Sequence, residues 1–138
     1  MQKQTAGGQE SPLASRSVPS TKQFAAVING VHTEFILTPF ADRIFIVITQ
    51  LGKLGTLITA SKETNDVMSG EPQEANYAID VLLGKRDEPL LALYARRIVE
   101  LICAKHARRS LLLSLCLKDH SLASLPIILD LLEANKVW

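Results

Sequence analysis

The feature that most constrains the fold is the run Arg43–Gln50 (RIFIVITQ), which consists almost entirely of β-branched and aromatic side chains. Such residues favour a β-strand. Successive side chains of a strand point to opposite faces of its sheet. The apolar residues of this run therefore divide between two faces, with Ile44, Ile46 and Ile48 on one and Phe45 and Val47 on the other. A strand that is apolar on both faces is typical of the buried centre of a sheet.

A second run of this kind, Leu111–Leu117, places Leu112 and Cys116 opposite four leucines. Shorter apolar runs bounded by turn residues predict four further strands. The turn at Asn29-Gly30 predicts a hairpin, and the turn at Leu51-Gly52-Lys53 predicts a second one that joins Arg43–Gln50 to the strand after it. The four strands predicted from the shorter runs are Phe24–Ile28, Thr33–Thr38, Leu54–Ala60 and Asn76–Leu83.

Two helices are predicted in the C-terminal half. Asp87 as a cap and Pro89 in the first turn mark the start of the first helix, which should end near His106. The second helix should span about Ser124–Asn135, since Pro126 is tolerated only in a first turn. Apolar residues three and four positions apart predict the buried face of each helix. They are Leu90, Tyr94, Ile98, Leu101 and Ile102 in the first helix and Leu125, Ile128, Leu129 and Leu132 in the second.

The order βββββαβα indicates the α+β class, with a six-stranded, mainly antiparallel sheet and two packed helices. Two helices can cover only one face of such a sheet, because neighbouring helices pack 8–10 Å apart. The other apolar face predicts a dimer-forming protein, unless the sheet bends into a sandwich and covers itself. The candidate residues for the dimer face, or alternatively for the core face, are Phe45, Val47, Leu112 and Cys116.

The chain of 138 residues predicts one domain, residues 21–138, behind a flexible tail, residues 1–20. The tail is rich in Gln, Ser, Gly and Pro, a composition too poor in apolar groups to form a core. The polar segment Ser61–Glu74 predicts a long mobile loop. The net charge of +1 indicates neither a nucleic-acid partner nor an anionic membrane, and no apolar run approaches the roughly 18 residues that span a bilayer.

No motif for chemistry emerges from the sequence, which predicts a protein that is not an enzyme and binds no metal or cofactor. His32, His106 and His120 do not pair at metal-ligand or catalytic spacing. Gly52-Lys53 superficially suggests a phosphate loop, but the Walker pattern needs a helix after it, and a strand is predicted instead. Cys103 and Cys116 are too far apart for a CxxC pair, so a reduced, intracellular protein is the simpler interpretation.

Several segments, in order along residues 21–138, resemble the proteasome assembly chaperone 3 family. The signature hairpin of that family is similar to residues 46–57 (IVITQLGKLGTL). Further similarity lies in residues 81–84 with 87–90, in residues 117–119 with Ser121, and in the terminal Val137-Trp138. The N-terminal tail is longer than is typical of that family.

The resemblance implies a cytoplasmic, and also nuclear, eukaryotic chaperone without ATPase activity or cofactor. It implies a dimer with a proteasome assembly chaperone 4-like paralogue, with self-association as an alternative. It also implies binding to proteasome α-type subunits, chiefly the fifth, during assembly of the 20S α-ring. The candidate contacts for the α-subunit lie in two turns: Gly52, Lys53 and Leu54 in the first, and Lys85 and Arg86 in the second.

Two other function classes fit the predicted fold. A dimeric scaffold of the longin or roadblock kind, used in membrane traffic, also combines a small antiparallel sheet with few helices. A small hydrolase would require titratable side chains that converge on a pocket. The partner that co-purifies with the protein distinguishes the first of these from a proteasome chaperone.

Overall fold

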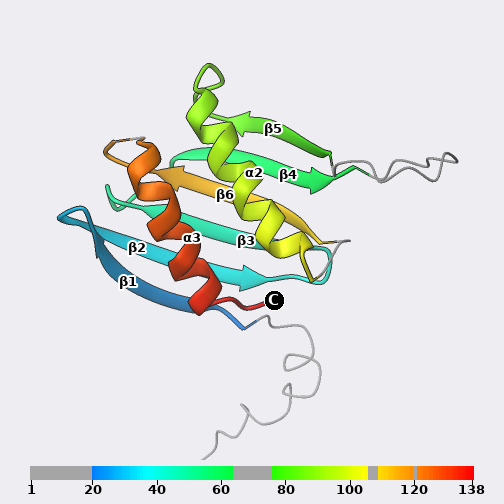
Figure 1. The fold of residues 1–138 in the computed structure, drawn as a ribbon, viewed down its shortest axis with the longest axis horizontal. Coiled ribbons are helices and arrows are strands. Elements are labelled where there is room, and N and C mark those ends of the chain that lie inside the picture. The colour runs from blue at the N-terminus through cyan, green and yellow to red at the C-terminus, as the bar shows by residue number, and fades with distance from the viewer. Residues whose placement is uncertain (1–19, 64–75, 106–108, 120) are drawn as a thin grey trace, which may run out of the picture.

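The computed structural model describes residues 20–63, 76–105, 109–119 and 121–138. These residues form one six-stranded sheet with two helices (Figure 1). The predicted order βββββαβα and the α+β class are confirmed. The elements are β1 (Lys22–Ile28), β2 (Val31–Pro39), β3 (Arg43–Thr49), β4 (Thr56–Lys62), β5 (Tyr77–Leu83), α2 (Pro89–Cys103), β6 (Ser110–Cys116), a single 3₁₀ turn η2 (Leu122–Ser124) and α3 (Leu125–Ala134).

The strands lie in the order β1-β2-β3-β6-β4-β5, so β6 is inserted between β3 and β4. The pairing of β3 with β6 is parallel and every other pairing is antiparallel. The sheet is therefore mixed, although mainly antiparallel. The prediction of a second hairpin at Leu51-Gly52-Lys53 is wrong, because β3 and β4 are not neighbours.

The insertion of β6 has a physical reason. Both β3 and β6 are apolar on both faces, and an edge position would expose such a strand to water. Pairing the two in parallel places them together at the centre of the sheet, with Ile44 beside Leu111 and Ile46 beside Leu113. The less apolar strands β1 and β5 form the two edges (Figure 1).

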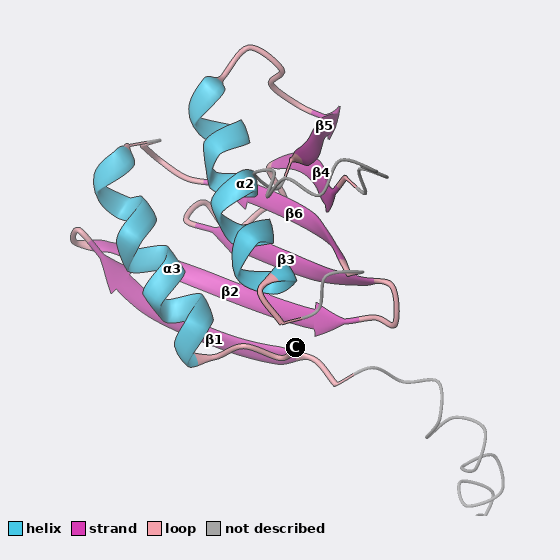
Figure 2. Ribbon diagram, turned by 45° about the vertical axis from the view of Figure 1, so that its right-hand side comes forward, coloured by secondary structure: helices cyan, strands magenta, loops and turns pink. Residues whose placement is uncertain are grey.

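Both helices pack on the same face of the sheet, as Figure 2 shows from the side. The core lies between this face and the helices. Ile44, Ile46 and Ile48 of β3 are fully buried in it, together with Leu111, Leu113 and Leu115 of β6. The isoleucine face of β3 is therefore the face that the helices cover.

The buried face of α2 differs in part from the predicted one. Tyr94, Ile98 and Ile102 are buried as expected, whereas Leu90 and Leu101 are only half-buried. Glu88 rather than Asp87 occupies the N-cap position, without a side-chain capping hydrogen bond, and the helix ends at Cys103, three residues before the expected end. The buried face of α2 is rotated about the helix axis relative to the predicted face, because α2 packs against β4 and β6. The spacing of leucines in the sequence does not reveal this packing. The buried residues are Leu91, Tyr94, Ala95, Ile98, Val99, Ile102 and Cys103.

The start of α3 is as predicted. Ser124 occupies the cap position and Pro126 lies in the first turn, where its missing N–H is not needed. Ser124 makes no capping hydrogen bond with its own helix; its hydroxyl instead accepts from the Asn29 side chain at 3.2 Å. Of the predicted apolar stripe, Leu129 is only half-buried. Three residues of the stripe are buried: Leu125, Ile128 and Leu132.

The first hairpin is confirmed. Asn29 and Gly30 both adopt positive φ angles, 51° and 79°, as a tight two-residue turn requires. Cys103 and Cys116 are both free and buried. The predicted tail (except Ser20), residues 64–74 of the predicted loop, His106 and His120 lie outside the described residues. No helix within the described ranges is both long and apolar enough to cross a membrane.

Candidate partner-binding surfaces

The face of the sheet opposite the helices carries a group of apolar side chains, interrupted by Ser114 and Thr59 and called the open face below. Strand pairing places these residues side by side, because paired residues point to the same face: Phe45 pairs with Leu112, and Val47 pairs with Ile36. No described helix packs against this face (Figures 1 and 2). The open face consists of Ile36, Phe45, Val47, Leu57, Leu83, Leu112 and Cys116.

Burial on the open face comes from neighbouring side chains within the sheet. Val47 at the centre is only 6% exposed, Phe45 and Leu112 are half-buried, and Leu83 on the edge strand is 69% exposed. Large apolar side chains that are this accessible on one face are typical of an interface. All four candidate dimer-face residues lie here rather than in the core under the helices: Phe45, Val47, Leu112 and Cys116.

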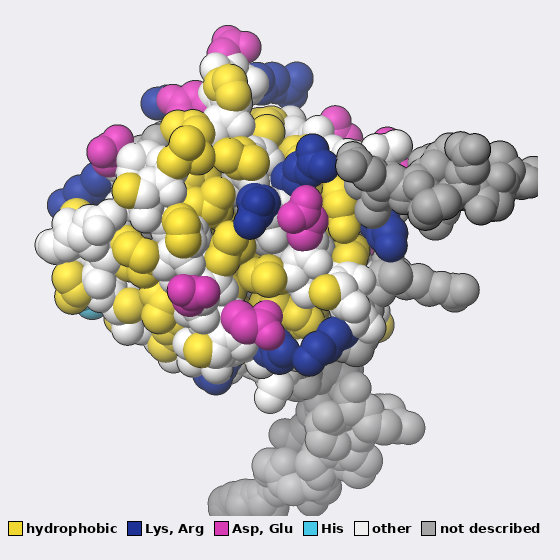
Figure 3. Space-filling view, viewed as in Figure 1, with side chains coloured by type: hydrophobic (Ala, Val, Ile, Leu, Met, Phe, Trp, Pro, Cys, Tyr) yellow, Lys and Arg dark blue, Asp and Glu magenta, His cyan; other side chains and the backbone are white. Residues whose placement is uncertain are grey.

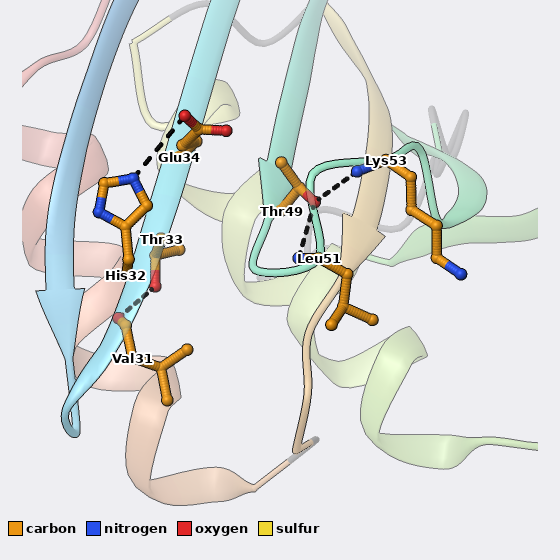
Figure 4. A network of polar contacts seen from close by, with 7 residues as sticks. All are labelled: Val31, His32, Thr33, Glu34, Thr49, Leu51 and Lys53. Carbon is orange, nitrogen blue, oxygen red and sulfur yellow. Dashed lines mark hydrogen bonds and ion pairs between the residues drawn. The ribbon is translucent and has the colours of Figure 1, made fainter.

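Charged groups on this side of the sheet lie away from its centre. His32 and Glu34 of β2 are both exposed or partly exposed, and their side chains approach to 3.7 Å (Figure 4). Asp80 of β5 pairs with Thr59 and is exposed. An apolar centre with charges toward the edges is the usual anatomy of a protein interface.

The helix-covered side is different in character. Figure 3 shows charged side chains interspersed among apolar ones across this side. On α2, Glu100 contacts both Arg96 at 3.3 Å and Arg97 at 3.8 Å. Mixed charges that pair locally are typical of a solvated helix surface.

The connection between β3 and β4 is held by side chains at the end of β3. The Thr49 hydroxyl accepts hydrogen bonds from the backbone N–H groups of Leu51 (3.3 Å) and Lys53 (3.2 Å), as Figure 4 shows. Gly52 supplies the positive φ of 68° that the turn needs. The turn therefore has a defined conformation, and the Lys53 side chain projects from it.

Gln50 ties this turn to two other strands. Its backbone N–H donates to the Cys116 carbonyl at 2.8 Å. Its side-chain amide donates to Thr33 at 3.0 Å and accepts from the Lys118 N–H at 2.9 Å. One residue thereby links the ends of β2, β3 and β6.

Gly55 lets the connection cross the end of β6 at close range. A Cβ at this position would lie 2.6 Å from the Cys116 Cβ and closer still to the Leu115 carbonyl oxygen. Its N–H donates to the Ser114 hydroxyl at 3.1 Å. The sequence predicted a simple hairpin turn here, and Gly55 was not identified as a position that must lack a side chain.

The two turns that carry the candidate α-subunit contacts meet at this end of the sheet. They border a groove of about 340 Å³, the end groove, where the chain after β5 approaches the β3–β4 connection. Lys53, Leu54 and Lys85 line it, whereas Gly52 and Arg86 do not. Sequence spacing could not bring residues 53 and 85 together. The described residues that line the groove are Leu51, Lys53, Leu54, Gly55, Thr56, Gly84, Lys85, Leu115, Cys116 and Leu117.

Titratable side chains are the candidates for a metal site or a reactive group. No group of three or more His, Cys, Asp or Glu residues in the described part of the chain could hold a metal ion. Burial raises the pKa of the Cys103 thiol and of the Tyr94 hydroxyl, so both groups are protonated near neutral pH. The Tyr94 hydroxyl donates to the Ser121 carbonyl at 2.6 Å, which is a structural contact.

Comparison with known proteins identifies the family. The model of the family described as proteasome assembly chaperone 3 matches residues 46–135. The chain belongs to this family. The matched range contains β4, β5, β6, both helices, residues 46–49 of β3 and every described residue that lines the end groove. The family consists of assembly chaperones without catalytic activity, which agrees with the prediction that the protein is not an enzyme.

Curated members of the family match most of the chain. Proteasome assembly chaperone 3 of Bos taurus is 38% identical over 128 residues, which cover 91% of this chain and 100% of the relative. The Homo sapiens protein of that name is 34% identical over 118 residues, covering 86% and 93%. The Nematostella vectensis protein is 32% identical over 122 residues, covering 86% and 90%.

A solved structure shares the fold. One chain of a structure described as a novel chaperone complex for yeast 20S proteasome assembly aligns with a TM-score of 0.65. The alignment covers 83% of this chain and 97% of that chain at 17% identity. This match supports the fold, and the family assignment excludes the longin or roadblock scaffold and the small hydrolase as function classes.

Proposed function

We propose that the protein promotes assembly of the 20S proteasome α-ring as a dimer and binds α-type subunits, chiefly the fifth. Its dimer partner is a proteasome assembly chaperone 4-like paralogue or a second copy of itself, and it acts in the cytoplasm. Family membership supports the role in assembly. The open face supports the proposed dimer, and it is the main structural observation behind the proposed mechanism.

Dimerisation through the open face follows from its chemistry. Two sheets that pack face to face interdigitate their inner side chains about 10 Å apart, which removes both apolar faces from water. Phe45, Val47 and Leu112 would lie at the centre of such a sandwich. The helices of each copy would then form the two outer layers. A second copy can pair by a two-fold axis, since the same patch serves both partners.

The contact with the α-subunit should have a different character. An assembly chaperone must release its client, so this contact should be smaller and more polar than the dimer interface. The turns Gly52–Leu54 and Lys85-Arg86 meet this requirement, because they are exposed and lie at the end of the sheet.

Sedimentation tests the dimer. The purified chain, alone and co-expressed with the paralogue, should sediment as a dimer, whereas Leu112→Arg should sediment as a folded monomer. Arg97→Glu on the helix-covered side is the matched control and should remain dimeric. A wild-type chain that stays monomeric under both conditions would refute the role of the open face.

Capture of subunits tests the client contact. Replacement of Lys53, Lys85 and Arg86 together by Glu should weaken capture of α-type subunits in a pull-down and leave the dimer intact. Absence of any proteasome α-subunit from wild-type pull-downs would refute the proposed function itself.

A further inference from the structure

The end groove has the properties of a preformed binding site. Its two walls are tied to the sheet by backbone N–H groups that donate to side-chain hydroxyls: Lys53 to Thr49 (3.2 Å) on one side and Lys85 to Thr56 (3.4 Å) on the other. Gly84, with φ of 108°, allows the chain after β5 to approach Thr56 closely. The groove is therefore already formed in the single chain, and a partner can bind in it without a large change of the backbone.

The groove is apolar at its base and at its rim. Leu115, Cys116 and Leu117 at the end of β6 are buried beneath it. Leu51 and Leu54 stand at the rim with 47% and 69% of their surfaces exposed. Two exposed leucines beside a concave apolar surface indicate that an apolar side chain of a partner belongs here.

The charge of the groove has one sign. Lys53 and Lys85 are the charged residues among the described ones that line it, and none of those residues carries a carboxylate. Lys53 makes no ion pair with any residue in the described part of the chain. Lys85 lies 3.8 Å from Glu88 at the surface, a pairing that water weakens strongly. The groove therefore favours an occupant with negative charge.

A peptide satisfies both properties, whereas a free phosphate and a nucleic acid do not. A free phosphate would leave the leucines uncovered. A nucleic acid would find no aromatic side chain to stack on among the residues that line the groove. A volume of about 340 Å³ is at the small end of the range for ligand sites, which suits one or two side chains of a longer segment.

We infer that the end groove binds a client segment in which an apolar side chain lies next to a carboxylate. The apolar side chain packs against Leu54 and Leu115, and the carboxylate is held between the ammonium groups of Lys53 and Lys85. This inference rests on the proposed function, because it defines the chemistry of the client. The carboxylate can belong to the C-terminus of a chain or to an Asp or Glu side chain.

The test is a titration of the full-length ¹⁵N-labelled protein followed by NMR. The probes are three short peptides, each with one leucine: one with a free C-terminal carboxylate, one amidated at the C-terminus, and one amidated with an aspartate before the leucine. Binding should shift the amide signals of Gly52–Gly55 and Gly84-Lys85. Response to the first peptide assigns the site to chain ends, and response to the third assigns it to acidic side chains.

The variant Lys53→Gln with Lys85→Gln should bind the responding peptide roughly tenfold more weakly, because two weak ion pairs are lost. The control Lys22→Gln with Lys118→Gln changes the net charge equally outside the groove and should bind as the wild type does. The inference is overturned if no carboxylate peptide shifts these signals, or if both double variants bind alike. Peptide binding without any α-subunit capture would instead refute the proposed function and leave the groove assignment standing.

Discussion

Several residues of the segment 46–57, which resembles the chaperone family, have identifiable structural roles. Thr49 accepts two backbone N–H groups, Gln50 joins three strands, Gly52 supplies a positive φ, and Gly55 permits a close crossing over β6. Lys53 and Leu54, between the two glycines, contribute exposed side chains. These contacts hold the backbone of the segment in a defined conformation and leave the side chains of Lys53 and Leu54 exposed.

Gly55→Ala should lower the free energy of unfolding by about 2–3 kcal/mol, because the new methyl group would collide with the backbone of β6. Denaturant unfolding followed by the fluorescence of Trp138, the only tryptophan, measures this change. Gly30→Ala is the control. Its Cβ would meet open space, so it should cost only about 1 kcal/mol for the positive φ. Equal losses at the two positions would contradict the close crossing at Gly55.

Stability should fall at alkaline pH. Burial raises the pKa of Tyr94 and of Cys103, so the unfolded chain loses these protons before the folded one does. Their contribution is fully present below the ordinary values of 9.0 for the thiol and 10.0 for the phenol, and it is lost as the pH rises through the higher folded values. Denaturant unfolding from pH 7 to 11 should therefore show a decline that begins near pH 9.

Tyr94→Phe separates the two contributions. It should cost about 1 kcal/mol at pH 7, because the hydrogen bond to the Ser121 carbonyl is lost. Above pH 10 its stability should decline less steeply than that of the wild type, since one titrating group is gone. Parallel curves for the two proteins above pH 10 would show that Tyr94 does not contribute to the decline.

At the scale of elements, β3 illustrates how one strand contributes to two faces of the sheet. Ile46 points into the core under the helices and is fully buried. Phe45, its neighbour in the chain, points to the open face and is half-buried. The alternation of a strand thus places adjacent residues on different faces, Ile46 in the core and Phe45 on the face proposed for association.

Ile46→Ala should destabilise each protomer by about 3 kcal/mol, the usual cost of a cavity at a well-packed core site. Phe45→Ala should cost a protomer less than half as much, because the side chain keeps contact with water in the single chain. Its main effect should be a weaker dimer, measured by sedimentation over a range of concentrations. A Phe45→Ala dimer as tight as the wild type would show that the open face is not the interface.

At the scale of the whole molecule, the sheet is a two-faced layer with helices on one side. In the proposed dimer, another molecule covers the second face. Folding and association are therefore coupled in such a dimer, and the stability of the fold depends on protein concentration.

This coupling predicts a thermal midpoint that depends on concentration. For a dimer of this length that unfolds to two chains, a hundredfold increase in concentration should raise the Tm by roughly 5 °C. Differential scanning calorimetry or fluorescence measures the shift. Leu112→Arg should show a Tm that is lower and independent of concentration. A constant wild-type Tm would indicate that the chain folds without a partner.

The sequence by itself determined what depends on local pattern. Six strands, two helices and their order follow from alternation, from the helical period and from turn residues such as Asn29-Gly30 and Pro126. The two-sided apolar character of the runs Arg43–Gln50 and Leu111–Leu117 also identified four of the seven open-face residues, and it predicted that the helices could not cover both sides. These features can be predicted from the sequence because each depends on residues that are close together in the chain.

Only the tertiary structure decided which strands are neighbours. The turn at Gly52 reads locally as a hairpin, yet β6 enters between β3 and β4 from more than fifty residues away along the chain. It also decided that the helices cover the isoleucine face and that Lys53 and Lys85 border one groove. The reason is physical: a local pattern records which side chains avoid water, whereas the choice among apolar partners depends on the packing of the whole sheet.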